Sequence, residues 1–171
     1  MDINQINDVK EENEMTIITL TSMNEEEFNL FLDATVPRYA QSVSKAQEIS
    51  FESALEKATS QTGTLLYEGL QTPNHYFFQI LCDGTSIGNL WIYIDVNTNS
   101  AFLYEIFIVE EGRGKRIGYH AIKKAEEWLI HEKGVPKFGL HVFAYNERAH
   151  KLYQKLGFQE ISFTMSKTIE P

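Results

Sequence analysis

The segment of the chain that most constrains the fold runs from residue 101 to residue 143. Residues 101–109 form a nearly continuous apolar run that Glu105 interrupts, and residues 110–116 are rich in glycine and charge. Apolar residues then recur at helical spacing over 117–129, and residues 138–143 are again typical of a strand. A strand, a helix and a strand in this order predict two parallel strands joined by a crossover helix.

The N-terminal half predicts one strand and two helices. Residues 16–20 are typical of a strand, and Asn24 followed by three glutamates is typical of a helix start. Pro37 lies near the expected end of that helix. Ser50 is the expected cap of a second helix, which Gly63 disturbs or ends.

The rest of the chain predicts a mixed sheet. Residues 76–82, 87–94 and 101–109 are three strands separated by short turns, which is typical of an antiparallel meander. Asn146 is the expected cap of a short helix, and residues 158–165 form the last predicted strand. The predicted fold class is α/β with an α+β mixed sheet, mostly antiparallel, with one parallel strand–helix–strand unit and about four flanking helices.

Composition narrows the class of protein. The chain has 171 residues, enough for one domain, expected over 15–171 after a flexible acidic extension over 1–14. The formal net charge of −9 disfavours nucleic acid as a partner, and no apolar run is long enough to span a membrane. Cys82 is the single cysteine, so no intrachain disulfide forms. Without a signal peptide at the start, these features predict a cytoplasmic protein.

The glycine-rich loop is the main candidate for ligand binding. Arg113, Lys115 and Arg116 gather there, although the chain is acidic as a whole. The loop opens a helix, whose first N–H groups are unpaired and carry partial positive charge, and its glycines allow a ligand to approach closely. These properties favour a pyrophosphate site, modestly ahead of a solvated loop whose glycine serves tight helix packing.

Two well-known phosphate motifs fit this loop poorly. A Walker loop requires Gly-Lys followed by Ser or Thr, but Gly114-Lys115 is followed by Arg116. The dinucleotide fingerprint expects an acidic residue at the end of the next strand to bind a ribose, and residues 141–144 contain none. Too little chain follows for a doubly wound sheet. A nucleotide-binding protein of another fold is therefore the weakest alternative.

The loop resembles the acetyl-CoA loop of the GNAT superfamily, whose pattern is Arg/Gln-x-x-Gly-x-Gly/Ala between the fourth strand and its following helix. Arg113 and Gly118 match the ends of the pattern, whereas Arg116 stands in place of the central glycine. That departure has little consequence if only the backbone N–H binds the ligand. It has more if the position requires a positive φ, which Arg tolerates poorly.

A second motif resembles the same superfamily. Residues 146–158 match the signature Asn-x-x-Ala-x-x-x-Tyr-x-x-x-Gly-Phe in register, at the expected place after the fifth strand. The resemblance covers most of residues 16–166. It implies the GNAT fold and an N-acetyltransferase that moves an acetyl group from acetyl-CoA to a primary amine by direct attack on the thioester, with no metal.

The resemblance also implies two catalytic residues. Tyr153 is placed to donate a proton to the departing thiolate or to hold the thiol, and its structural alternative is a core tyrosine. Glu105 is the candidate base, because a carboxylate beside apolar walls has a raised pKa. A Glu105 that faces solvent or forms an ion pair is equally well supported, and many relatives use a water chain with no dedicated base.

The implied cofactor-binding residues come from the two motifs and the preceding strand. The backbone of Ile106 and Ile108 is expected to pair with the pantetheine arm like an added strand. The N–H groups from Gly114 to Tyr119 are expected to bind the pyrophosphate, with charge supplied by the cations of the loop. Asn146 is expected to cap its helix and touch the cofactor. The full set is Ile106, Ile108, Arg113, Gly114, Lys115, Arg116, Gly118, Tyr119 and Asn146.

The acceptor is expected to be a small-molecule or peptide amine. Loose candidates for its pocket are Tyr39, Glu48, Glu68 and Tyr76, whereas His75 and His141 are expected to be structural. Pairing through C-terminal strands is common in the superfamily, so a homodimer is an option.

The alternative function is a non-catalytic acyl-CoA-binding module of the same fold, for which Arg116 is the one hint in the sequence. A gap between residues 105–110 and the strand 138–143 would favour either function, and continuous pairing would contradict both.

Overall fold

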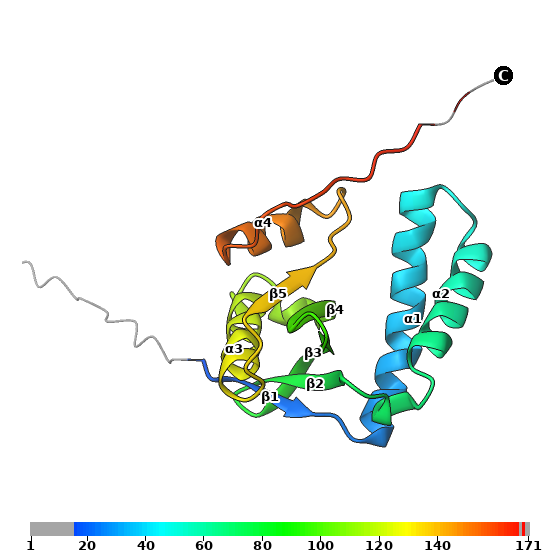
Figure 1. Ribbon diagram of the computed structural model, residues 1–171. Helices are drawn as coiled ribbons and strands as arrows, with labels where there is room; N and C mark the ends of the chain where they lie inside the picture. The colour runs from blue at the N-terminus through cyan, green and yellow to red at the C-terminus, as the bar shows by residue number, and fades with distance from the viewer. Residues whose placement is uncertain (1–15, 168, 170–171) are drawn as a thin grey trace, which may run out of the picture.

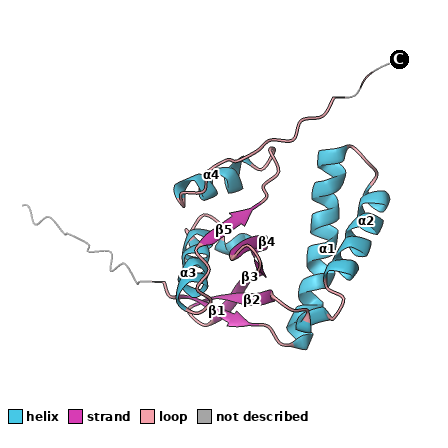
Figure 2. Ribbon diagram, in the orientation of Figure 1, coloured by secondary structure: helices cyan, strands magenta, loops and turns pink. Residues whose placement is uncertain are grey.

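A computed structural model describes residues 16–167 and residue 169. These residues form a central sheet with helices on both faces (Figure 1 and Figure 2). The predicted extension 1–14 lies outside the described residues. In chain order the elements are β1 (Ile18–Ser22), α1 (Glu25–Gln47), α2 (Phe51–Leu65), η1 (Gly69–Gln71), β2 (His75–Cys82), β3 (Thr85–Asp95), β4 (Ser100–Ile108), η2 (Glu110–Gly112), α3 (Ile117–His131), β5 (Lys137–Leu140) and α4 (Glu147–Lys155).

The five strands lie in the sheet in the same order as in the chain, β1-β2-β3-β4-β5. Neighbours from β1 to β4 pair antiparallel, and β4 and β5 pair parallel. The parallel pair is joined through α3, as expected when a crossover helix returns the chain to the same edge. The predicted fold class, a mostly antiparallel sheet with one parallel strand–helix–strand unit, is confirmed.

The helices cover the two faces of the sheet unequally. The apolar stripe of α3, with Ile122 and Leu129 fully buried, packs on Ile80, Leu90 and Ile92 of the sheet. On the opposite face, Phe28 and Phe31 of α1 pack on Phe77 of β2 and Trp91 of β3. In Figure 1, α2 lies outside α1, where small buried alanines let the two helices approach closely. The sheet is thus buried on both faces.

Helix α1 begins where the sequence predicts and ends much later. Asn24 caps it through its side chain, and Glu27 completes a capping box by accepting from the backbone N–H of Asn24. The prediction that the helix ends near Pro37 is wrong, because α1 continues to Gln47. Because proline has no backbone N–H, the helix lacks one backbone hydrogen bond at Pro37. The turns beyond it are held by burial of Ala40 and Val43 against α2.

Helix α2 and two strands also differ from the predicted bounds. Ser50 caps α2 as predicted, and the helix continues through Gly63 to Leu65. A glycine in an exposed helix position weakens the helix by about 1 kcal/mol without ending it. Strand β5 stops at Leu140 instead of residue 143, and β1 lies slightly further along the chain than the predicted 16–20.

The predicted last strand, residues 158–165, is not formed. Phe158 packs against Phe138 of β5, and the residues after it run past α4 (Figure 1) without forming a ladder with any strand of the sheet. Ile161, Phe163 and Met165 remain 96%, 77% and 92% exposed. Apolar and polar residues alternate here as in a strand, but the pattern needs a partner edge.

Candidate active site

A cavity of about 1020 Å³ opens between α1 and α2 on one side and β4, α4 and the segment 141–143 after β5 on the other. Of the predicted site residues, Glu105, Ile106, Asn146 and Tyr153 line it together. They come from β4, from the N-cap of α4 and from α4 itself. The tertiary structure therefore joins β4, the strand that precedes the glycine-rich loop, and the second motif on one hollow of ligand size.

A β-bulge in β4 aims Glu105 into the cavity. Trp91 pairs with Glu105 and the next residue of β3, Ile92, pairs with Leu103, so Tyr104 is an extra residue. In strict alternation Glu105 would share the α3 face with Leu103. With the bulge, Glu105 reaches Arg38 of α1, while Ile106 returns to the α3 face.

Strand β4 separates from β5 beyond the bulge. The parallel pairing runs from Ser100 opposite Lys137 to Leu103 opposite Leu140. Within the described chain, residues 104–108 have no partner strand on that edge. This is the gap that favours an acyl-CoA-binding site over the nucleotide-binding alternative, because an open strand edge can accept an extended ligand as an added strand.

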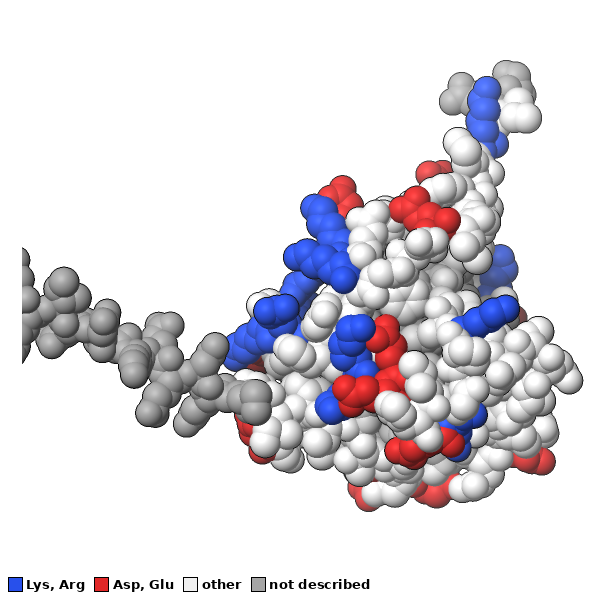
Figure 3. Space-filling view, turned by 60° about the vertical axis from the view of Figure 1, so that its left-hand side comes forward, with Lys and Arg blue, Asp and Glu red and all other residues white. Residues whose placement is uncertain are grey.

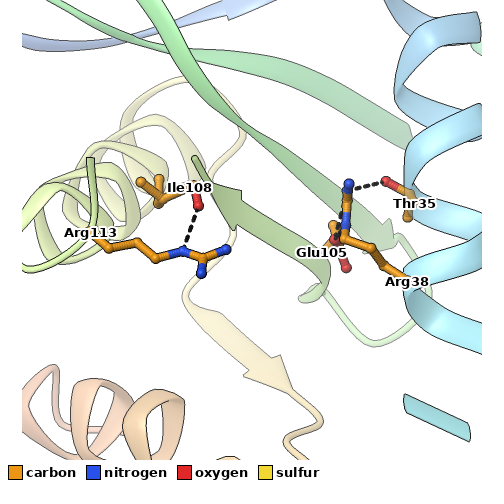
Figure 4. Close-up of polar contacts among 5 residues, drawn as sticks. All are labelled: Thr35, Arg38, Glu105, Ile108 and Arg113. Atoms are coloured by element: carbon orange, nitrogen blue, oxygen red, sulfur yellow. Dashed lines mark hydrogen bonds and ion pairs between the residues drawn. The ribbon is translucent and has the colours of Figure 1, made fainter. Parts of the chain in front are cut away.

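Glu105 forms an ion pair with Arg38 (Figure 4). The guanidinium Nη2 and Nε of Arg38 lie 3.2 and 3.4 Å from Oε1 of Glu105. Arg38 is held from behind by Oγ1 of Thr35 at 2.8 Å, and its guanidinium lies 4.0 Å from the ring centroid of Phe107. Burial raises the pKa of Glu105 above its ordinary value, and the charge and hydrogen bonds of Arg38 oppose that rise.

Tyr153 is 9% exposed in the core beneath α4 and also lines the cavity. Burial, with a smaller contribution from the charge of Glu105, raises its pKa to about 12. The phenol therefore stays protonated at neutral pH and is available as a proton donor. Asn146 caps α4 by accepting from the N–H of Ala149 at 3.2 Å.

The glycine-rich loop lies at the end of β4, outside the lining of the cavity, and is exposed except at Gly112. Arg116 is the N-cap of α3, with φ 61° and ψ 10°, so the position does require the left-handed conformation that glycine favours. The first helical hydrogen bond in α3 runs from the N–H of His120 to the carbonyl of Arg116. The N–H groups that precede it have no helical partner.

The side chains of the loop differ in what they contact. Arg113 turns back, and its Nε donates to the carbonyl of Ile108 at 3.0 Å (Figure 4). The guanidinium of Arg116 lies 5.4 Å from the ring of Tyr119. A Cβ on Gly118 would lie 3.4 Å from a methyl of Leu152, which is an ordinary van der Waals contact, so the approach of α3 to α4 leaves room for an alanine at this position.

The loose acceptor candidates separate clearly. Tyr39 lines the cavity, whereas Glu48, Glu68 and Tyr76 do not. His141, which was expected to be structural, also lines the cavity. Tyr76 lies on the α3 face against Trp128, because strand alternation points it away from α1.

His75 is structural, as expected from the sequence. It is buried, and its Nδ1 accepts a hydrogen bond of 2.9 Å from Nε1 of Trp91.

Three residues of the site are absent from the predicted set. Arg38 was hidden by the predicted helix end at Pro37. Had the helix been continued, Phe31, Thr35 and Arg38 would have fallen on one face, and a cation on an apolar stripe is a recognisable signal. Trp91 and Tyr104 stack with ring centroids 4.6 Å apart on the wall of the cavity, and only the pairing of β3 with β4 brings the two rings together.

The described residues contain no group of three His, Cys, Asp or Glu side chains arranged to hold a metal ion. Within the same residues, no helix is both long and apolar enough to cross a membrane.

Known proteins resemble this chain in sequence and in structure. The sequence profile of the acetyltransferase (GNAT) family matches residues 40–158. YycN of Bacillus subtilis (strain 168), named an uncharacterized N-acetyltransferase, is 35% identical over 158 residues, which cover 91% of this chain and 100% of YycN. YdgE of the same organism, named in the same way, is 34% identical over 154 residues, which cover 88% of this chain and 98% of YdgE.

The crystal structure of YycN superposes with a TM-score of 0.85 at 34% identity, covering 91% of this chain and 100% of that one. An aminoglycoside N-acetyltransferase, AAC(6′)-Iy in complex with CoA, superposes with a TM-score of 0.56 at 18% identity, covering 91% of this chain and 97% of that one. The second likeness is one of fold alone. With the profile match and the full-length similarity to YycN, the chain belongs to the GNAT family and is an N-acetyltransferase.

Proposed function

We propose that this protein transfers the acetyl group of acetyl-CoA to a primary amine bound in the cavity. The observation that carries the proposal is the meeting, on one hollow, of the open edge of β4 with Glu105 and Tyr153. A donor laid along that edge would present its thioester between an acid and a base, and α1 and α2 would enclose the acceptor.

The donor side fits CoA. The unpaired edge over residues 104–108 offers backbone groups of Ile106 and Ile108 to the pantetheine amides. The N–H groups at the start of α3 and the cations Lys115 and Arg116 suit the pyrophosphate. Arg113 contributes by holding the loop to the carbonyl of Ile108. Acetyl-CoA supplies the activated acetyl group, and AAC(6′)-Iy was solved with CoA.

The chemistry needs one proton removed and one delivered. Both contacts of Arg38 go to Oε1 of Glu105, which leaves Oε2 to accept the proton of the attacking amine, directly or through water. A bond forms between the amine nitrogen and the acetyl carbon, and the carbon–sulfur bond breaks. Tyr153, protonated at neutral pH, would donate to the departing thiolate.

Calorimetric titration with acetyl-CoA, with NADH and ATP as controls, tests the donor site first. Selective binding that free CoA competes is the expected result. A thiol-detection assay with a mixture of primary amines then tests turnover. No binding at millimolar acetyl-CoA would refute the proposal.

A non-catalytic acyl-CoA-binding module is the less supported alternative. Arg116 at a left-handed position is its one hint. The N–H groups before His120 have no helical partner whichever side chain stands at position 116, so they stay available to a ligand. Binding of acetyl-CoA with no thiol release in the presence of any amine would favour the alternative.

The predicted homodimer also stays a proposal. The alternating exposed residues Ile161, Phe163 and Met165 have the pattern of a strand that lacks a partner, and a second copy could supply the edge. Light scattering would measure the molar mass of the full chain and of a variant with serine at all three positions. A dimeric full chain and a monomeric variant are expected, and a monomeric full chain would refute the proposed dimer.

A further inference from the structure

The acceptor side of the cavity is electrically neutral, although the protein is acidic. The formal net charge of the chain is −9. The described residues that line the cavity include one arginine, Arg38, one acidic residue, Glu105, and one histidine, His141, and Arg38 and Glu105 pair at 3.2 Å. The wall from α1 and α2 instead presents uncharged Ser42, Ser60 and Thr64.

Apart from Glu105, the acidic side chains of the described residues lie outside the lining of the cavity. On the face shown in Figure 3, acidic and basic side chains stand next to one another, and α3 carries the ion pairs Lys123–Glu126 and Lys124–Glu127. The negative charge of the protein therefore does not prepare the cavity for a ligand with several positive charges. Each additional ammonium group would leave water without a carboxylate partner, which is unfavourable.

The cavity offers aromatic surface instead. Tyr39 of α1, Tyr67 after α2 and Tyr104 of β4 line it from three sides, and they are 41%, 68% and 40% exposed. Tyr104 is also fixed in orientation, because its ring stacks on Trp91 at an interplanar angle of 20°. Exposed aromatic rings that converge on one hollow are suited to cover a flat apolar body.

One position in the cavity suits an amine. Oε1 of Glu105 is occupied by Arg38, and no hydrogen bond to Oε2 occurs within the described residues. Because Glu105 and the tyrosines line the same cavity, a single ammonium at Oε2 would also lie near aromatic rings, which attract a cation. The arrangement therefore has room for one amine head and one apolar body.

Resting on the proposed function, we propose that the acceptor is a primary monoamine with an aromatic or bulky apolar body, and that polyamines are poor acceptors. The amine head is placed at Glu105, and the body lies among Tyr39, Tyr67 and Tyr104. The same chemistry covers a free arylalkylamine and an amine at the end of a peptide next to an aromatic side chain.

The test compares acceptors at saturating acetyl-CoA with the full chain, using thiol release. Phenethylamine, propylamine and spermidine are the probes, and a dipeptide with an N-terminal Phe distinguishes the peptide source from the free amine. The expected kcat/KM is highest for phenethylamine or the dipeptide, at least about tenfold above that for propylamine and spermidine, which is the factor expected for stacking of one ring.

Two variants with a matched control separate ring contact from general damage. Tyr39→Leu is expected to raise KM for phenethylamine about tenfold and to leave KM for propylamine unchanged. Phe51→Leu removes a similarly exposed helix aromatic outside the cavity, 46% exposed, and is expected to change neither. Ser42→Asp adds a carboxylate to the wall and is expected to lower KM for spermidine.

A higher kcat/KM for spermidine than for phenethylamine would overturn the inference, and so would equal effects of Tyr39→Leu and Phe51→Leu on phenethylamine. Turnover of none of the probes by a protein that binds acetyl-CoA would also overturn the acceptor class, while the donor site would stand. Failure to bind acetyl-CoA in the calorimeter would instead refute the proposed function.

Discussion

Acidification is expected to destabilise this protein through His75. The ring is 8% exposed, and its Nδ1 accepts from Nε1–H of Trp91 at 2.9 Å. Indole nitrogen can only donate, so Nδ1 must be unprotonated in the folded state. Burial lowers the pKa of His75 from 6.5 to about 4. The folded protein therefore resists a protonation that the unfolded chain accepts freely.

The sign and size of the effect follow from this shift. Above the pKa that His75 has in the unfolded chain, His75 is neutral in both the folded and the unfolded state, and the protein has its full stability. Between that value and the folded pKa only the unfolded state binds the proton, so the free energy of unfolding falls as the pH falls. The difference of about 2.5 units between the two pKa values of His75 lowers the free energy of unfolding by about 3 kcal/mol. Most of this loss has occurred when the pH reaches the pKa of His75 in the folded state.

Urea unfolding of the native protein and of His75→Gln, each at about pH 7 and about pH 4, isolates this contribution. Other titrating groups are common to both proteins, so the native chain is expected to lose about 3 kcal/mol more than the variant. His131→Gln, which removes an exposed histidine at the end of α3, is the matched control and is expected to behave like the native chain. Equal losses in the native protein and His75→Gln would refute the reasoning.

Protonation of His75 is also expected to reach the active site. An imidazolium places an N–H against the N–H of Trp91 and breaks their hydrogen bond, and Tyr104 stacks on that Trp91 ring. A change of tryptophan fluorescence that follows the same pH range, absent in His75→Gln, would report this movement.

Three further predictions concern the site itself. Arg116→Gly is expected to stabilise the protein by up to about 1 kcal/mol, because relief of about 1–2 kcal/mol of left-handed strain exceeds the entropy that glycine adds to the unfolded chain. A lower midpoint of urea unfolding, with the dependence of the unfolding free energy on urea unchanged, would contradict this. Tyr153→Phe is expected to lower kcat on the order of 100-fold with little change in acetyl-CoA affinity, because a proton donor is lost; equal kcat would exclude the phenol as the acid. Arg38→Gln is expected to move the acid limb of the kcat/KM profile to higher pH, because burial then raises the pKa of Glu105 unopposed; an unmoved limb would show that Glu105 is not the base.

Much of the fold was predictable because its signals are local. The capping box at Asn24 and the helical stripe of α3 depend on residues within a few positions of one another. The same holds for the second motif, where Asn146 caps α4 and Tyr153 follows two turns later on its buried face. Elements of this kind form where the chain itself satisfies their backbone groups.

The errors occur where distant contacts override a local signal. Pro37 should end a helix, but burial against α2 carries α1 ten residues further, to Gln47. Residues 158–165 have the alternation of a strand but pair with no edge of the sheet. A strand is defined by its partner, and no property of the segment alone can supply one.

The sequence alone was sufficient to predict the order of the elements from β1 to α4, the two motifs and the family that they indicate. Each of these depends on the spacing of residues along the chain. The side of the sheet on which Glu105 lies could not be predicted in this way, because the bulge at Tyr104 reverses the alternation that the sequence implies. The same holds for its partner: Arg38 is 67 residues away and meets Glu105 only when α1 packs across the sheet. Local hydrogen bonding produces the elements, whereas the charge and shape of the active site result from how their faces are brought together.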